Sequence, residues 1–436
     1  MVTSLLYRRP AQVVSTRASL SGEEKQRSIE SSINSGCSCM SNGIPESLSF
    51  DKIIAGGTCP PLTVRDFMNY LKYVEYSAEN LQFFLWYKDY TSRFDKLPDN
   101  EKALSPTWTK SDAEAALASR PRKPNAIVAQ LLQNTTFADV KTTAVERVDP
   151  FHTPPESPSL DENHDDDRTT IATTTDSTQG AAEAFDKAGM KWMPFTMQPY
   201  RDEITRIITV YISDGAPRQL NLSDRERRGL LHALQTTTHP SSFQEIVTTV
   251  EYSLRKQAHP NFMRWTICNG NRPRVLFARG LGIFGIAAGF IADLLLTLSH
   301  AGRAWRVLPF IAWFIGIATL IAAWKGMCVV LHGLHHRHLR PWELFEDSPE
   351  PGLDEKHMSQ ESLASSSRNS YEDEPWVSRY EKRNYVRKIF DREVWIEEPA
   401  LRQIQDTIFL QALAGSFVLS SIVTGIFCAV PKGNFY

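Results

Sequence analysis

The chain has 436 residues, of which 42% are hydrophobic, and a formal net charge of −2 at pH 7. A balance this close to neutral excludes a general attraction to nucleic acid, and six cysteines in this length exclude a disulfide framework. The length allows about two or three structural units. No GxxxxGK(S/T) phosphate loop, HExxH zinc motif or credible Ser/His/Asp arrangement occurs, so we expect neither an enzyme active site nor a cofactor.

Residues 1–58 are rich in Ser, Gly and charged residues and show little apolar periodicity. We therefore expect this region to be disordered. It has no apolar core followed by a cleavage site, so we expect no secretory signal. Cys37 and Cys39 lack a second Cys or His pair, and no metal site is expected there.

Helical patterning begins near Leu62. Thr63 and Asp66 have the spacing of a capping box. A break at Tyr76-Ser77 separates this helix from a second one, for which Ser77 is a suitable N-cap. The sequence therefore predicts two consecutive helices here.

Glu79 and Asn80 open the second helix, directly before the aromatic run LQFFLWYKDY. Short polar side chains at this position can simply cap the helix. They can also form a binding edge that the helix supports. The residues alone leave both interpretations open.

Residues 96–190 are polar, acidic and Thr-rich, and we expect a long disordered insert there. Helical patterning returns in residues 191–272, with apolar residues at helical spacing and two further capping boxes. The apolar positions are Ile204, Ile207, Ile208, Tyr211 and Ile212, and the boxes are Ser223 with Glu226 and Ser242 with Glu245. Because no strand alternation occurs, the sequence predicts an all-α bundle split by the insert.

Three apolar segments, residues 280–299, 307–324 (continuing to 331) and 407–430, are long enough to cross about 30 Å of hydrocarbon as helices. Basic residues gather before the first segment and between the second and third. The positive-inside rule therefore predicts that the N-terminal region and residues 332–406 are cytosolic. Arg279 and Lys325 fall at the predicted cytosolic ends, where long side chains reach the headgroups.

Asp293 is the exception, because it lies inside the first predicted span. An intramembrane carboxylate is a candidate functional residue, but no opposite charge is expected at its depth, so we favour a role in helix packing or at the interface. Gly285 and Gly289 form a GxxxG pair, which allows close helix approach.

Four histidines follow the second span, at His332, His335, His336 and His338. Adjacent residues point to different sides of a helix, so converging metal ligands are not expected. We expect instead a collar that faces the headgroups, together with Arg337, Arg340 and Trp342.

The stretch FMNYLKYVEYSAENLQFFLWYKDY resembles the start of the RGS (regulator of G-protein signalling) domain, and ITRIITVYISDGAPRQLNLSDRERRGLL and FQEIVTTVEYSLRKQAHPNFMRW are similar to its middle and its closing helices. The resemblance implies a helical domain that binds an activated Gα subunit and stabilises its GTP-hydrolysis transition state without a catalytic side chain of its own. Glu79 and Asn80 match the Glu-Asn contact pair of that family.

Other positions depart from the RGS pattern. No Asn occurs between Gly229 and Ala233, where the family has one, and Gln257 and Asn261 stand where it has a late Asp and Arg. The resemblance therefore allows two hypotheses. One is a G-protein regulator that accelerates GTP hydrolysis, and the other is a scaffold whose helical domain docks a partner.

The whole plan, with the split domain, three C-terminal spans and LHGLHHRHLRPWE after the second span, resembles the fungal Rax-type bud-site-selection membrane proteins. This implies a role in cell polarity, at the plasma membrane of growth or bud sites, and a second membrane protein as partner. Gα, the membrane lipid and that protein are the expected partners. The expected organisation is 1–58 disordered, 59–95 and 191–272 RGS-like, 96–190 insert, 275–331 hairpin of spans one and two, 332–406 cytosolic loop, 407–430 span three and 431–436 tail.

Overall fold

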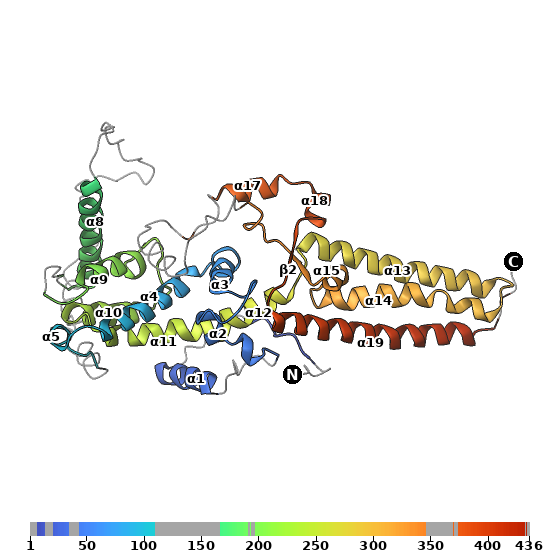
Figure 1. Ribbon diagram of the computed structural model, residues 1–436, viewed down its shortest axis with the longest axis horizontal. Helices are drawn as coiled ribbons and strands as arrows, with labels where there is room; N and C mark the ends of the chain where they lie inside the picture. The colour runs from blue at the N-terminus through green and yellow to red at the C-terminus, as the bar shows by residue number, and fades with distance from the viewer. Residues whose placement is uncertain are drawn as a thin grey trace, which may run out of the picture. The chain divides into compact units, whose positions relative to one another are not determined.

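The computed structural model describes residues 7–13, 21–34, 43–109, 166–190, 192, 197–345, 369, 374–431 and 433. The chain divides into two compact units, Met1–Asp89 with Glu245–Tyr436, and Tyr90–Gln244. We call them the first and second units. The described residues are mostly helical (Figure 1).

The N-terminal part of the first unit is built from short helices. They are α1 (Gly22–Asn34), η1 (Glu46–Leu48), α2 (Phe50–Ile54), α3 (Val64–Tyr70), η2 (Leu71–Glu75), the start of α4 (Ala78–Asp95), α11 (Gln244–Ser253, from Glu245 on), η5 (Leu254–Ala258) and α12 (His259–Ile267). The predicted capping box of Thr63 and Asp66 is confirmed, since both of its hydrogen bonds form at the start of α3. The predicted break is also confirmed, because Tyr76 has a left-handed φ of 54° between η2 and α4.

Aromatic side chains join α3 to α12. The ring of Phe262 lies 4.9 Å from that of Phe67 and 5.3 Å from that of Tyr70, measured between centroids, and Tyr70 also contacts Trp265. Phe67 and Phe262 are fully buried. The core therefore forms between segments almost two hundred residues apart in the sequence.

The expectation of disorder over residues 1–58 is wrong for part of this region. Leu48, Phe50 and Ile53 are buried, and Arg255 donates two hydrogen bonds of 2.6 Å to the carboxylate of Asp51. These apolar residues are too few to fold alone, but Phe67 of α3, Phe84 of α4 and His259 of α12 pack against the ring of Phe50. Local composition does not show such distant contacts.

The second unit contains the end of α4 and the helices α5 (Asp99–Lys102), α8 (Asp166–Lys187), α9 (Arg201–Ile207), η3 (Ile208–Ile212), α10 (Asp224–Thr236) and η4 (Pro240–Phe243). The capping box of Ser223 and Glu226 is confirmed at the start of α10. The one predicted for Ser242 and Glu245 is wrong. η4 precedes α11 there, and the His239 side chain accepts the capping hydrogen bond from the Ser241 N–H.

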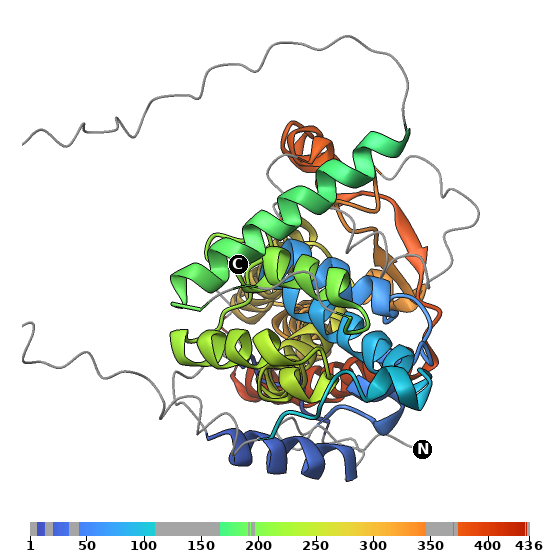
Figure 2. The same cartoon turned by 90° about the vertical axis from the view of Figure 1, so that its left-hand side faces the viewer.

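The helix α8 lies inside the segment 96–190, which was expected to be disordered throughout. Its last turns bury Ala181, Ala184 and Phe185, and Phe185 stacks on Trp192 at 4.4 Å. The Thr209 hydroxyl of η3 donates to the Ser177 carbonyl at 2.8 Å. Small residues and one aromatic are thus enough to seat this helix on its neighbours (Figure 2). The remainder of the predicted insert, apart from residues 96–109, lies outside the described residues.

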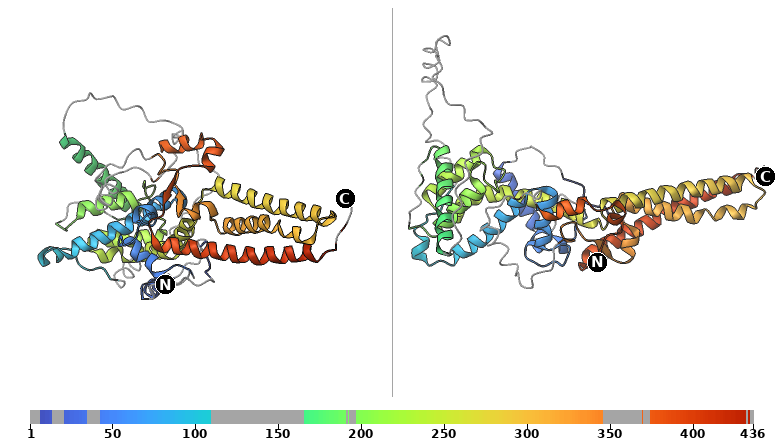
Figure 3. Two further views of the ribbon diagram at one scale, coloured as in Figure 1. Left: turned by 45° about the vertical axis from the view of Figure 1, so that its right-hand side comes forward. Right: turned by 90° about the horizontal axis from the view of Figure 1, so that it is seen from above.

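Among the described residues, three helices are long and apolar enough to cross a membrane, in the three regions that the sequence predicts. α13 (Arg272–Leu298) and α14 (Phe310–Trp324, preceded by η6, Arg303–Val307) form a hairpin, and α19 (Pro399–Ala429) lies beside it (Figure 3). Large apolar side chains on their outer faces are exposed, among them Phe284 at 70% and Ile311 at 60%. Such a surface is suited to lipid contact.

The prediction of an all-α fold is incomplete, because the segment between α14 and α19 contains two short strands. β1 (His336–His338) pairs antiparallel with β2 (Glu393–Trp395), and His336 lies opposite Trp395. The helices α15 (Val329–Gly333), α17 (Pro375–Glu381) and α18 (Tyr385–Ile389) complete this segment. Three-residue strands carry too little alternation to be recognised from the sequence.

The pH dependence of stability should reflect His259, which is completely buried; its Nε2 lies 2.9 Å from the Leu48 carbonyl oxygen. Burial lowers the pKa of His259 from 6.5 to about 4. The folded state therefore resists protonation of His259. The contribution of this residue to the free energy of unfolding is fully present above pH 6.5 and is lost as the pH falls toward 4. We expect a loss of about 2 kcal/mol from this residue by pH 5. Unfolding of the full chain in detergent at pH 7 and pH 5 should show a smaller loss in His259→Gln, and an equal loss in both proteins would contradict the assignment.

The packing of α13 on α14 should depend on Gly289. A Cβ added there would lie 2.6 Å from Nε1 of Trp313, whose side chain is buried. Overpacking of this kind costs about 1–3 kcal/mol, so Gly289→Ala should lower the unfolding temperature in detergent. Gly280→Ala is the matched control, because its Cβ would meet no atom within 4 Å. Equal unfolding temperatures in the two variants would refute this packing.

Candidate functional site

Glu79 and Asn80, which we call the acid–amide corner, lie in the first turn of α4. The chain bends immediately before them, where the Ser77 N–H donates to the Leu71 carbonyl at 2.9 Å and the left-handed Tyr76 ends η2. Both corner residues are half-buried. The break thus places the corner at the junction between η2 and α4.

A residue from the segment between α14 and α19 covers the corner. The Asn369 side chain exchanges two hydrogen bonds of 3.2 Å with Gln82 of α4. Burial raises the pKa of Glu79, and a hydrogen bond from Asn369 acts against that rise. The carboxylate of the corner is therefore partly desolvated by its own chain.

Further contacts of the same segment fall on η2. The Glu374 carboxylate lies 2.5 Å from Nζ of Lys72, and the ring of Trp376 lies edge-on to that of Tyr73 at 5.4 Å. We call Asn369, Glu374 and Trp376 together the cover. A partly exposed ion pair contributes only about 0.2–1 kcal/mol, so this cover is held by displaceable contacts.

Asn261 occupies the position at which the RGS pattern has a late Arg. Its side chain forms hydrogen bonds within the first unit. Its side-chain amide donates to the Glu75 carboxylate at 2.8 Å and to the Val13 carbonyl at 3.0 Å, and its carbonyl oxygen accepts from the Val13 N–H. The side chain is buried. Asn261 therefore ties the N-terminal segment to α12 and to the end of η2.

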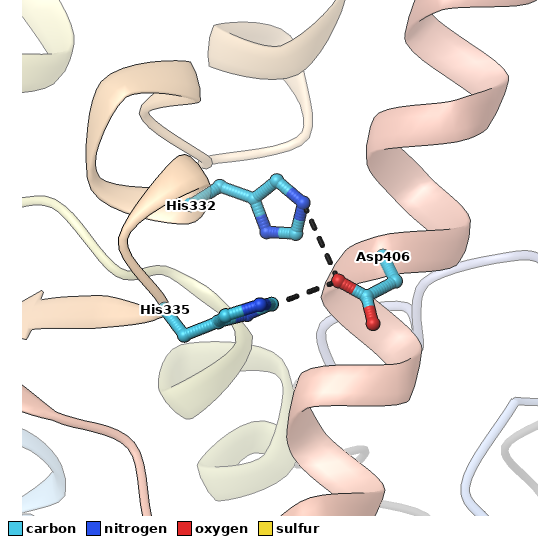
Figure 4. A group of neighbouring side chains, drawn as sticks. All are labelled: His332, His335 and Asp406. Atoms are coloured by element: carbon cyan, nitrogen blue, oxygen red, sulfur yellow. Dashed lines mark ion pairs between the residues drawn. The ribbon is translucent and has the colours of Figure 1, made fainter.

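A second group of polar side chains lies beyond α14. His332, His335 and Asp406 each direct one ligand atom to a common point, and these three atoms lie within 4.8 Å of one another (Figure 4). Nε2 of His332 is 3.4 Å and Nδ1 of His335 is 3.9 Å from Oδ1 of Asp406. We call these residues the His–Asp group.

The predicted collar of side chains facing the headgroups is wrong. His332, Arg337, His338, Arg340 and Trp342 are all buried. Arg337 pairs with Glu343 at 2.7 Å, and the guanidinium of Arg340 lies 3.6 Å above the Trp265 ring centroid. The prediction assumed one continuous helix, but α15 ends at Gly333, His335 has a left-handed φ and β1 begins at His336.

Inside the three-helix bundle, Asp293 is fully buried and faces a charge that was not expected. Arg306 of η6 is also fully buried and attracts the Asp293 carboxylate electrostatically. Its guanidinium donates to the carbonyl oxygens of Phe427 at 2.8 Å and Val430 at 2.7 Å. The expectation of no opposite charge at this depth is therefore wrong, because η6 turns Arg306 back into the bundle, where it caps the C-terminal end of α19.

The remaining predicted membrane residues lie where the helices meet. Gly285 and Gly289 face α14, with a Cβ at Gly285 in ordinary contact with Gly316. Arg279 donates to the Ala323 carbonyl at 3.4 Å, and Nζ of Lys325 donates to Gln411 of α19. Both cations therefore make contacts within the protein as well as lying near helix ends.

Three residues of these candidate sites, Asp406, Arg306 and Asn369, were not predicted from the sequence. The His332-x-x-His335 spacing is a usable signal, but Asp406 directly precedes the predicted third span and was counted with the loop. Arg306 was counted with the turn, and Asn369 with the polar segment. Only long-range packing brings them to their sites. No protein-family model, curated protein or solved structure matches the chain.

The Arg306 cap should be important for the stability of the bundle. Arg306→Gln leaves two C-terminal carbonyls and the buried Asp293 without their cation, and we expect a loss of about 3–5 kcal/mol. Arg303→Gln is the matched control, because Arg303 is exposed in the same turn. Unfolding temperatures of the full chain in detergent should fall for the first variant alone. A similar fall in both would show that the turn matters only through its total charge.

Proposed function

We propose that this chain is a membrane-anchored docking protein. Its helical N-terminal part lies in the cytosol and binds a protein partner through the acid–amide corner, and its three apolar helices hold that part at the membrane. The exposed apolar faces of α13, α14 and α19 support the anchor. Anchoring raises the effective concentration of the corner near other membrane-bound proteins.

The observation that carries the docking proposal is the cover on the corner. Glu79 is neither part of the apolar core nor fully in water. Asn369, from a polar segment, is hydrogen-bonded to Glu79 and to Gln82, and Glu374 of the same segment pairs with Lys72 of the adjacent η2. Edges of this kind, half-buried and lined with polar and aromatic side chains, are suited to exchange one partner for another. The cover then occupies the place of a partner until that partner arrives.

The RGS resemblance proposes an activated Gα subunit as this partner. The Rax-type resemblance proposes a role in cell polarity and bud-site selection at the plasma membrane, together with a second membrane protein. Docking is favoured over acceleration of GTP hydrolysis because Asn261 is engaged with Glu75 and Val13 inside the first unit. An active GTPase-accelerating regulator is the alternative.

The test uses the full chain in nanodiscs and a Gα subunit loaded with GDP and aluminium fluoride, which mimics the transition state. The double variant Glu79→Gln/Asn80→Ala should weaken binding at least tenfold, since each change removes a polar group at the edge. Glu46→Gln is the matched control, an exposed carboxylate in the same unit. Equal binding by the double variant and the wild type would contradict the corner as the contact.

Removing the cover should have the opposite effect. In Asn369→Ala/Glu374→Ala/Trp376→Ala the corner is open. If the open state is about 10% populated in the wild type, full opening raises the apparent affinity for Gα about tenfold. Biolayer interferometry gives both affinities. Single-turnover GTP hydrolysis decides between docking and acceleration. If neither the wild type nor the open variant binds Gα, that partner is wrong.

A further inference from the structure

The His–Asp group joins two segments that are distant in the sequence. His332 and His335 follow the second apolar helix, and Asp406 belongs to the third (Figure 4). His332 packs on Phe409 of α19 at 4.7 Å, and its side chain is 6% exposed. The two imidazole rings and the carboxylate thus meet where α15 contacts α19.

The three side chains do not satisfy one another. The distances of 3.4 and 3.9 Å to Asp406 exceed those of a normal N–H···O hydrogen bond. Nδ1 of His335 is buried and has no hydrogen-bond partner among the described residues.

The spacing fits a small metal ion. Ligand atoms about 2.0–2.2 Å from a tetrahedral zinc ion lie about 3.3–3.5 Å from one another. The separation of His332 from Asp406 already has this value, and that of His335 exceeds it by a few tenths of an ångström. The three ligand atoms all lie within 4.8 Å of one another, so rotations of the two imidazole rings would bring the set to this spacing.

The backbone at His335 is held in a conformation that few residues adopt. Its φ is 52°, in the left-handed region. Its N–H donates to the His332 carbonyl at 2.8 Å, and its own carbonyl accepts from the Ile396 N–H at 3.0 Å. Strained positions of this kind persist where the surrounding structure over-determines them, often at ligand sites. Here the strain directs the imidazole toward Asp406.

We propose that Nε2 of His332, Nδ1 of His335 and the Asp406 carboxylate bind one divalent transition-metal ion of the zinc type. Two imidazoles and one carboxylate suit Zn²⁺, whereas Mg²⁺ and Ca²⁺ prefer oxygen ligands alone. Three protein ligands leave the fourth position to water. The ion cross-links the segment after the second apolar helix to the third helix, and this site is independent of the proposed docking function.

The test measures Zn²⁺ binding to the full chain in detergent by isothermal titration calorimetry, after treatment with a chelator. We expect one ion per chain with micromolar or tighter affinity, and an unfolding temperature that rises with free Zn²⁺. His335→Asn removes the imidazole and keeps a residue that tolerates a left-handed φ. Asp406→Asn keeps the shape and removes the charge. Each should weaken Zn²⁺ binding at least tenfold.

His336→Asn is the matched control, because His336 is adjacent in the sequence and lies outside the group. It should keep wild-type affinity. The proposal is overturned if 100 µM Zn²⁺ neither binds nor raises the unfolding temperature of the wild type. It is equally overturned if His335→Asn and Asp406→Asn, each folded by circular dichroism, bind Zn²⁺ as tightly as His336→Asn. Tighter binding of Mg²⁺ than of Zn²⁺ would exclude the zinc class.

Discussion

The organisation of the first unit depends on the hydrogen bonds of one buried amide, Asn269, directly after α12. Its side chain accepts from the Cys328 N–H at 2.7 Å and donates to the Cys328 carbonyl at 3.2 Å. Its backbone carbonyl accepts from the His338 N–H at 2.9 Å. Asn269 is 1% exposed, so these groups have no water to replace a lost partner. The end of α12, the start of α15 and the strand β1 are therefore fixed to one another at a single point.

The end of α12 is secured in the same region by side chains from both ends of the sequence. Arg9 donates to the Arg264 carbonyl at 2.6 Å and to the Lys325 carbonyl at 2.6 Å, and Gln405 of α19 donates to the Ile267 carbonyl at 3.1 Å. The last carbonyls of a helix lack partners within it. Here the N-terminal segment and α19 supply them, and this explains why a segment with so few apolar residues is ordered.

Most features with a local signal were predicted correctly, with the capping box at Ser242 and Glu245 as the exception. The box of Thr63 and Asp66, the break at Tyr76 and the long apolar helices each depend on neighbouring residues alone. Prediction from the sequence failed where burial is supplied from far away, as for Phe50 and for α8. The same holds for the candidate sites. Glu79 and Asn80 could be predicted because they begin a helix, whereas the contact of Asn369 with this corner could not. For the His–Asp group the spacing of the histidines was visible, and the third ligand was not.

The segment between α14 and α19 connects both sites through its closed base. β1 pairs with β2, and the Ile396 N–H donates to the His335 carbonyl, so the two ends of the segment lie side by side. The residues of the cover lie between these ends in the sequence. Because the base already holds the two ends of this segment together, the contacts of the cover need to close only a shorter length of chain.

The base and the cover of this segment differ in stability. The base has the backbone pairing of β1 with β2 and the Arg274–Glu393 contact at 2.6 Å, in which Arg274 is buried, whereas the cover has side-chain contacts at a partly exposed edge. Local opening follows the weakest contacts first. The cover can therefore leave Glu79 while β1, β2 and the His–Asp group remain in place, and a metal ion at that group would strengthen the base without holding the corner closed.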